Sequence, residues 1–186
     1  MARPTRVAAE DIEQAAVNLV RANGLSALTA RGVADALGVS TQPVYSSWGS
    51  MDALRERVDE RVRAFIQTYL AQPEPGAPPM LSLGLRTVRL AKEEPHLFDL
   101  AAAWMRHQIA GPPPPPIIAA LRADPRLTTA SVERLTQVNA LMWIFTQGLA
   151  AMVRDGSPVT TLDIARIHLS TAGDAIIAHV ASLPDP

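Results

Sequence analysis

The sequence contains no cysteine, and a single lysine stands beside sixteen arginines. Without cysteine the chain has no disulfides, no thiolate metal site and no cysteine nucleophile. The longest apolar region, Leu141 to Val153, is too short to cross a bilayer and is interrupted by Thr146, Gln147 and Gly148. No cationic segment followed by an apolar one precedes the first expected helix, so we expect a cytoplasmic protein without a membrane partner.

An excess of positive charge is also missing, because the formal net charge is −1. DNA affinity usually comes from lysine and arginine displacing counterions from phosphate, so charge alone does not suggest a DNA-binding protein. Within residues 1–65, carboxylates match the arginines in number. Residues 1–6, which contain Arg3 and Arg6, form a short basic arm that is either ordered on DNA or simply a disordered terminus.

No pattern typical of an enzyme appears. The sequence has no serine, histidine and aspartate at catalytic spacing, no glycine-rich phosphate loop and no paired carboxylates on an apolar helix. The histidines form two pairs, each eleven residues apart, which is three helical turns and too far for one metal ion. These histidines are His96, His107, His168 and His179. We therefore expect no enzyme, no metal site and no cofactor.

Apolar residues recur at helical spacing along the chain and no strand pattern appears, so the predicted fold is all-α. Hydrophobic residues make up 48% of the sequence, which is enough for a sizeable core. We expect a helix-turn-helix domain over residues 1–49 and a larger helical domain over residues 50–186. The prolines at 71–79 predict a loop, and those at Pro112 to Pro116 predict a polyproline II spacer.

The most informative segment is residues 28–54, which predicts two short helices across a tight turn, followed at once by a third. Thr29 is placed to cap the first helix and Gly38 to end it. Ser40 is placed to cap the second helix, and Ser50 the third, longer one. This arrangement presents side chains to a DNA major groove and favours a regulator.

At these residues the sequence resembles the TetR family of bacterial one-component transcription repressors, over roughly residues 7–55. Two positions differ from the family's usual pattern: Ser47 stands where His is usual and Met51 where Lys is usual, and both usual residues contact phosphate. The matching positions are Ile12, Ala15, Ala16, Leu19, Gly24, Leu28, Thr29, Arg31, Val33, Ala34, Leu37, Gly38, Val39, Ser40, Tyr45, Trp48, Ser50 and Leu54. The resemblance implies a repressor that an effector releases from DNA. It also implies that the last two long helices of each subunit form a four-helix bundle with those of a second subunit across a two-fold axis.

The second helix of the motif is expected to contact double-stranded DNA. Gln42 can bind adenine through two hydrogen bonds, and Pro43 can contact a thymine methyl group. The resemblance implies that the Tyr45 hydroxyl binds a phosphate. The full set of expected DNA contacts is Thr29, Arg31, Thr41, Gln42, Pro43, Tyr45, Ser46, Ser47 and Ser50. For each residue alone, capping or solvating its helix is the alternative interpretation.

The last two predicted helices are apolar on more than one side. The first runs from about Thr129 to Arg154, and the second begins at a capping pair, Thr160 and Asp163, and runs to about Leu183. Such helices favour a homodimer interface, and a fully internal core is the alternative. Aromatic, methionine and polar residues near them are candidates to line a small-molecule cavity, or else belong to the core. These candidates are Phe98, Trp104, Met105, His107, Gln108, Met142, Trp143, Phe145 and Gln147.

The sequence therefore predicts a ligand-responsive repressor that binds a palindromic operator as a homodimer and is released by an unidentified small-molecule effector. The alternative is a TetR-like helical module that binds a small molecule or a protein and has weak affinity for DNA.

Overall fold

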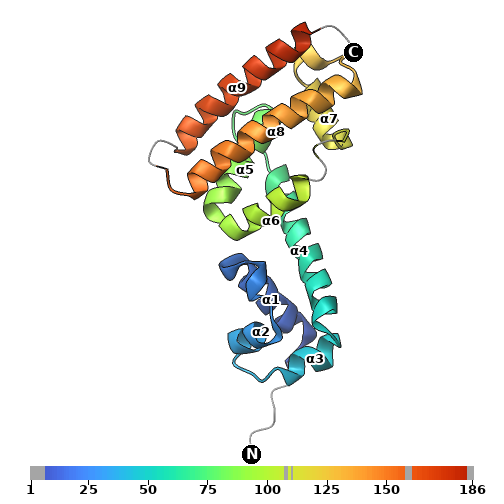
Figure 1. Ribbon diagram of the computed structural model, residues 1–186, viewed down its shortest axis with the longest axis vertical. Helices are drawn as coiled ribbons and strands as arrows, with labels where there is room; N and C mark the ends of the chain where they lie inside the picture. The colour runs from blue at the N-terminus through green and yellow to red at the C-terminus, as the bar shows by residue number, and fades with distance from the viewer. Residues whose placement is uncertain (1–6, 107–108, 110, 158–160, 184–186) are drawn as a thin grey trace, which may run out of the picture. The chain divides into compact units, whose positions relative to one another are not determined.

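A computed structural model of the chain describes residues 7–106, 109, 111–157 and 161–183. Over these residues the secondary structure is helical without any strand, which confirms the predicted all-α fold (Figure 1). The chain divides into two compact units, Met1–Gln67 and Thr68–Pro186. The predicted domain boundary, between residues 49 and 50, lies at the junction between the third and fourth helices. The division into compact units lies later, after Gln67, so most of the fourth helix belongs to the first unit.

The first unit is built from three helices, a 3-10 turn and most of a long fourth helix. These elements are α1 (Ala9–Asn23), the 3-10 turn η1 (Leu25–Ala27), α2 (Ala30–Leu37), α3 (Gln42–Trp48) and α4 (Met51–Ala71). A closely packed apolar core joins them, because each helix buries one side. The core includes Ile12, Ala16, Val17, Val20, Leu28, Val33, Ala34, Val44, Leu54, Val58, Val62 and Ile66.

Three of the predicted helix ends in this unit are confirmed. The Thr29 hydroxyl accepts a hydrogen bond from the Gly32 N–H at 3.0 Å and caps α2. Gly38 ends α2 in the left-handed conformation, with φ 67° and ψ 32°, which glycine adopts without a Cβ clash. The Ser50 hydroxyl accepts from the Ala53 N–H at 3.2 Å at the start of α4.

The predicted cap of α3 is wrong. The residue before α3 is Thr41 rather than Ser40, and the Thr41 side chain makes no capping hydrogen bond. Thr41 has helical backbone angles, φ −72° and ψ −14°, whereas a capping side chain reaches the first turn from an extended backbone. Pro43 lies in the first turn of α3, where its missing N–H costs no intrahelical hydrogen bond.

A buried carboxylate ties α1 to α4 within the first unit. Glu13 is buried on α1 and accepts hydrogen bonds from Arg57 Nε at 3.3 Å and from Arg61 Nη1 at 3.1 Å. Because Arg57 and Arg61 lie one turn apart on α4, the two contacts hold the first half of this helix against α1.

The second unit contains the remaining helices. They are α5 (Pro79–Glu93), α6 (Pro95–Arg106), α7 (Pro115–Arg122), the 3-10 turn η2 (Pro125–Leu127), α8 (Val132–Arg154) and α9 (Leu162–Ser182). The helices α5, α8 and α9 pack on one another, and α8 and α9 run side by side (Figure 1). Within the described ranges, none of the helices has the length and apolar character that a membrane span requires.

Prolines in this unit start helices more often than the sequence predicted. The expected spacer Pro112 to Pro116 is shorter, because α7 begins at Pro115, and Pro114 before it has an extended backbone. Pro95 likewise opens α6. A proline ring holds φ near its helical value, and the first turn needs no N–H from it. The cap of α9 is Thr161, and Thr160 lies outside the described residues.

A second buried carboxylate, Glu74, lies in the loop after α4. It accepts hydrogen bonds from Arg86 Nη1 at 3.3 Å and from Arg89 Nε at 3.2 Å. Burial of Glu74 raises its pKa, but the hydrogen bonds from Arg89 and Arg86 outweigh this effect and leave the pKa below its ordinary value. The Arg86 guanidinium also lies 4.0 Å from the centre of the Tyr69 ring.

Tyr69 itself is held at the end of α4. Its hydroxyl donates to Glu93 at 2.6 Å, and its carbonyl accepts from Arg86 Nε at 3.0 Å. Burial and the hydrogen bond to Glu93 raise the pKa of Tyr69, so the phenol stays protonated. These contacts fasten the last turn of α4 to α5.

Candidate nucleic-acid interface

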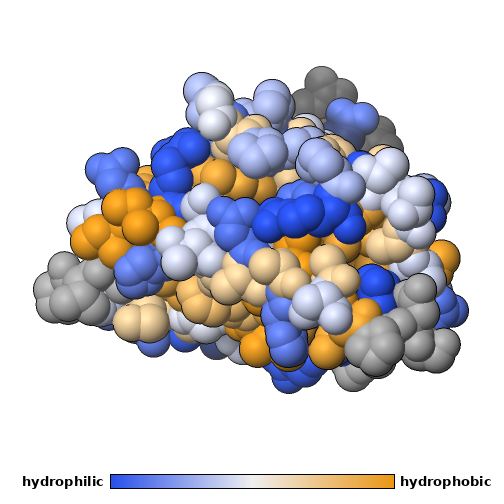
Figure 2. Space-filling view, turned by 90° about the horizontal axis from the view of Figure 1, so that it is seen from above, coloured by the Kyte–Doolittle hydropathy of each residue, from blue (hydrophilic) through white to orange (hydrophobic). Residues whose placement is uncertain are grey.

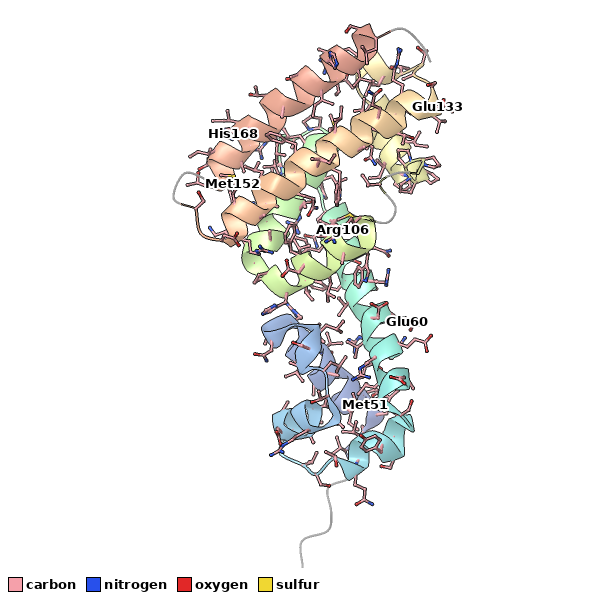
Figure 3. All side chains as sticks on the ribbon, in the orientation of Figure 1. Met51, Glu60, Arg106, Glu133, Met152 and His168 are labelled. Carbon is pink, nitrogen blue, oxygen red and sulfur yellow. The ribbon has the colours of Figure 1, made fainter. Side chains whose placement is uncertain are left out.

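All nine predicted DNA contacts lie in three short segments of the first unit: the start of α2, the helix α3 with the residue before it, and the residue before α4. All of them are exposed except Pro43, which is partly buried. Met51, labelled in Figure 3, marks the start of α4 just after α3. The structure thus places the nine residues in α3 and at the starts of α2, α3 and α4.

The helix α3 has a buried side and an exposed side. Val44 is buried in the core of the unit, whereas the neighbouring Tyr45 is 49% exposed. Trp48, one turn after Val44, is partly buried, and its indole N–H is buried without a hydrogen-bond partner. The buried residues fix the rotation of α3 about its own axis, so the exposed side is left to Gln42, Tyr45 and Ser46.

Three of the predicted hydroxyl contacts already make hydrogen bonds inside the unit. Thr29 and Ser50 accept from backbone N–H groups, and the Ser46 hydroxyl donates to the Pro43 carbonyl at 3.2 Å. A capping hydroxyl keeps its own hydrogen, so Thr29 and Ser50 can still donate to a phosphate oxygen. Ser46 would have to rotate its hydroxyl before donating elsewhere.

Positive charge near these segments is sparse. The Arg31 side chain is 88% exposed and lies 3.8 Å from Asp35, at the limit of an ion pair. Arg57 and Arg61 are engaged with Glu13, and Arg63 with Asp59 at 2.6 Å. Arg3 and Arg6 of the expected basic arm fall outside the described residues. Of the predicted contacts, Arg31 is thus the one that carries a formal charge.

Sequence reasoning missed Arg55, which lies in the first turns of α4. Its guanidinium donates to the Leu28 carbonyl at 3.5 Å and pairs with Asp52 at 3.0 Å. Leu28 directly precedes the capping residue Thr29, so a second positive charge lies at the start of α2. Its position five residues after Ser50 was a usable signal, but only the fold connects it to Leu28.

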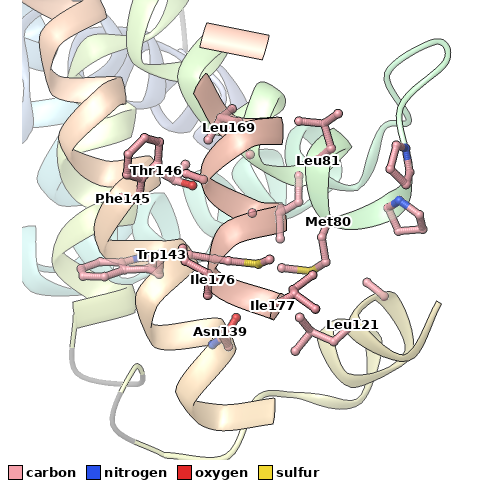
Figure 4. A pocket seen from close by; sticks show the side chains of 18 of the residues that line it. Met80, Leu81, Leu121, Asn139, Trp143, Phe145, Thr146, Leu169, Ile176 and Ile177 are labelled. Carbon is pink, nitrogen blue, oxygen red and sulfur yellow. The ribbon is translucent and has the colours of Figure 1, made fainter. Parts of the chain in front are cut away.

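The second unit contains a cavity of about 340 Å³ between α5, α7, α8 and α9 (Figure 4). Five of the predicted ligand-binding residues line it: Met105, Met142, Trp143, Phe145 and Gln147. Phe98 and Trp104 do not, and Phe98 is buried with the Arg154 guanidinium 5.9 Å from its ring centre. His107 and Gln108 lie outside the described residues.

Large apolar side chains are exposed along α8 and α9. Ile144 is 60% exposed and Ile167 is 63% exposed. Leu141, Phe145 and Met152 are also exposed on α8, with Met152 labelled in Figure 3. In the view of Figure 2, apolar residues form several exposed groups between polar and charged side chains.

Among the described residues, no group of three or more potential metal ligands gathers. His107 lies outside these residues. His168 is exposed on α9 (Figure 3), and His96 lies in the first turn of α6.

Residues 12–58 match the family described as "Bacterial regulatory proteins, tetR family". The match runs from α1 into α4, so it contains the predicted contacts and the helices that position them. The second unit lies outside the match. No curated protein matches the chain.

Proposed function

We propose that this chain, a TetR-type DNA-binding transcriptional regulator, acts as a homodimeric repressor that is released from a palindromic operator by a small molecule. The observation that carries the proposal is the exposed polar side of α3, held by the buried Val44 within the segment that matches the family. The first unit would read DNA, and the second would dimerise and bind the effector.

The exposed side of α3 offers both base and phosphate contacts. Gln42 can present its amide to N6 and N7 of adenine, and Thr41 can reach a base edge or a phosphate. Tyr45 can donate its hydroxyl to a phosphate oxygen, which sets the register of the helix but reads no sequence. Arg31 and Arg55 would supply the charge at the start of α2, although Arg55 would first have to loosen its pair with Asp52.

A second copy of the chain is the partner that best fits the exposed side of α8 and α9. Leu141, Ile144 and Gly148 follow one another at helical spacing on α8, and a methyl group at Gly148 would meet no atom within 4 Å. A face that combines exposed apolar residues with an open glycine lets two helices approach closely. A two-fold dimer would then place two copies of α3 in successive major grooves, about 34 to 36 Å apart.

Release by an effector would act through α4. This helix begins beside the DNA-contacting segments, and its last turn belongs to the second unit, where Tyr69 is held by Arg86 and Glu93. A molecule in the cavity need only favour one position of this helix over another. A coupling free energy of about 1 to 3 kcal/mol is typical of such a switch.

The DNA-reading part of the proposal is tested by fluorescence anisotropy with DNA from the protein's own promoter region. Gln42→Ala should weaken operator binding about tenfold or more while leaving nonspecific binding nearly unchanged, because it removes a base contact. Tyr45→Phe should weaken both about equally, because it removes a phosphate contact. Gln67→Ala, an exposed glutamine on α4, is the matched control and should change neither. Unchanged affinity in both test variants would contradict the assigned DNA contacts.

One observation favours the alternative of a binding module with weak DNA affinity: the arginines on α4 of the first unit are paired with acids. Salt dependence separates the two functions. A regulator should bind its operator at nanomolar concentration with affinity that falls steeply as salt rises. Micromolar binding with no preference for the promoter sequence would support the module instead.

A further inference from the structure

We infer that the cavity of the second unit takes an uncharged, mainly apolar molecule with one hydrogen-bond acceptor, which binds the Trp143 indole N–H and the Gln147 amide N–H. A ketone, an ester or an amide carbonyl on a hydrocarbon frame has this chemistry. The inference rests on the proposed function in taking the cavity as the effector site.

The first observation is the apolar lining. Side chains from α5, α7, α8 and α9 surround the cavity, and Figure 4 shows Met80, Leu121 and Ile177 gathered on one side of it. Leu81, Leu169 and Ile176 continue this apolar wall. The hydrocarbon part of a ligand would leave water for apolar surroundings in this cavity. This transfer is the main source of affinity in a cavity of this size.

The second observation is a pair of donors without partners. The Trp143 indole nitrogen and the Gln147 amide nitrogen are both buried, and neither makes a hydrogen bond. Both residues are among those that line the cavity. They lie one turn apart on the same side of α8. A buried donor without a partner is costly, so a ligand that brings an acceptor recovers a hydrogen bond that the empty protein lacks.

The third observation is the absence of a free charge. Among the described residues that line the cavity there is no lysine, arginine or histidine, so an anion would be buried without a countercharge. The two lining carboxylates, Asp124 and Asp174, are both bound by Arg126, at 2.6 Å and 3.0 Å. The hydrogen bond from Arg126 lowers the pKa of Asp124, so this carboxylate stays ionised and paired. A cation would therefore have to displace Arg126.

The test uses the full-length protein and four probes that share one ring system: acetylnaphthalene, ethylnaphthalene, naphthoate and naphthylmethylamine. The same four substituents on a benzene ring give a second, smaller series. Isothermal titration calorimetry should rank the acetyl probe at least about tenfold tighter than the ethyl, anionic and cationic probes of its series. An anion or a cation that binds as tightly as the acetyl probe, or no binding in either series, would overturn the inference.

Two variants assign the acceptor to its donors. Trp143→Phe keeps the aromatic ring but removes the N–H, and Gln147→Met keeps the length but removes the amide. Each substitution should lower the affinity for the acetyl probe about tenfold and change the affinity for the ethyl probe by less than about twofold. Neither nitrogen has a hydrogen-bond partner in the protein, so removing the two N–H donors breaks no hydrogen bond that these nitrogens make. An equal loss for both probes, or no loss, contradicts the assignment.

Trp104→Phe is the matched control, because Trp104 does not line the cavity and its substitution should change neither probe. Operator affinity is measured with and without each probe. This measurement tests the proposed effector-controlled release separately from the inferred ligand class. Tight binding of the acetyl probe without DNA release supports the ligand class and contradicts ligand-controlled release. DNA release by the anionic probe supports ligand control and contradicts the ligand class.

Discussion

The two units of the chain treat their apolar residues differently. Among the described residues of the first unit, only Leu25 and Tyr45 are large apolar or aromatic side chains with high exposure, at 53% and 49%. In the second unit such residues are concentrated on α8 and α9, with Ile144 and Ile167 the most exposed. The first unit therefore satisfies its own core and presents a polar surface, whereas the second leaves apolar surface that a partner can cover.

The two units also share one structural device. Each buries a glutamate that accepts hydrogen bonds from two arginines of a different segment, Glu13 in the first unit and Glu74 in the second. The arginines around Glu13 are 49% and 40% exposed, whereas Arg86 beside Glu74 is only 11% exposed. The pair in the second unit is less screened by water, so its loss should cost more stability.

The largest expected effect comes from charging the exposed apolar face. Ile144→Glu combined with Ile167→Glu should turn the proposed dimer into a monomer, because it would bury carboxylates opposite one another across the two-fold axis of that dimer. Operator affinity should fall at least about a hundredfold, since one half-site is then bound at a time. Analytical ultracentrifugation and anisotropy measure the two effects.

The control for this experiment is Leu25→Glu, which places the same charge at an exposed apolar residue of the first unit. It should leave the oligomeric state unchanged. A double variant that stays dimeric, or a wild-type protein that is already monomeric at micromolar concentration, would refute the contrast drawn between the two units.

The next largest effect concerns Glu74. Glu74→Gln should lower the free energy of unfolding by about 2 to 3 kcal/mol, because Arg86 and Arg89 lose a buried charged partner. Urea denaturation followed by circular dichroism measures the loss. Glu56→Gln, an exposed glutamate of the first unit, should change stability by less than about 0.5 kcal/mol.

The contribution of Glu74 should also depend on pH. Its pKa is lower in the folded protein than in the unfolded chain, so its stabilising effect is complete above about pH 4.3 and is lost as the pH falls through the folded pKa. The difference in unfolding free energy between the wild type and Glu74→Gln should therefore shrink in acid. A difference that stays constant down to pH 2 would mean that the ion pair is not its source.

A smaller effect is expected at Gly32 in the first unit. A methyl group there would lie 2.6 Å from the Ala27 carbonyl oxygen, which belongs to the backbone and cannot rotate away. Gly32→Ala should destabilise the protein by about 1 to 3 kcal/mol despite the better helix propensity of alanine. Thermal unfolding measures this change, and a stabilised variant would show that α2 can shift away from η1.

The smallest effect is expected at Gly148 in the second unit, where replacement by alanine should stabilise the monomeric protein instead of destabilising it. In the monomeric Ile144→Glu, Ile167→Glu background, Gly148→Ala should raise the unfolding free energy by about 0.5 to 1 kcal/mol, because its surroundings are open. In the dimeric background the same change should gain less or lose stability. Equal gains in both backgrounds would place Gly148 outside the interface.

Local features of the fold were predictable from the sequence when they depended on neighbours a few residues apart. The caps at Thr29 and Ser50 and the stop at Gly38 each involve one hydrogen bond or one backbone conformation within a single turn. The cap at Ser40 was wrong because the tight turn before α3 sets where the helix begins. Pro115 was misassigned for a similar reason, since a proline run is compatible with both a spacer and a first helical turn.

Contacts between segments far apart in sequence were not predictable in the same way. Arg55 meets the Leu28 carbonyl only because α4 packs beside α2. Met105 lines the cavity and its neighbour Trp104 does not, although both fit the same composition argument. One residue along a helix turns the side chain by about 100°, and the packing of α6 decides which of the two faces inward.

The amino-acid order by itself determined the all-helical fold, the helix-turn-helix with its caps at Thr29 and Ser50, and the resemblance of that motif to the TetR family, because periodicity and capping act within a few residues. The tertiary structure alone decided that the side-chain nitrogens of Trp143 and Gln147 are buried without a hydrogen-bond partner, and that Ile144 and Ile167 stay exposed. Burial and pairing depend on what other helices bring to the same place, and a pattern along one helix carries no record of its neighbours.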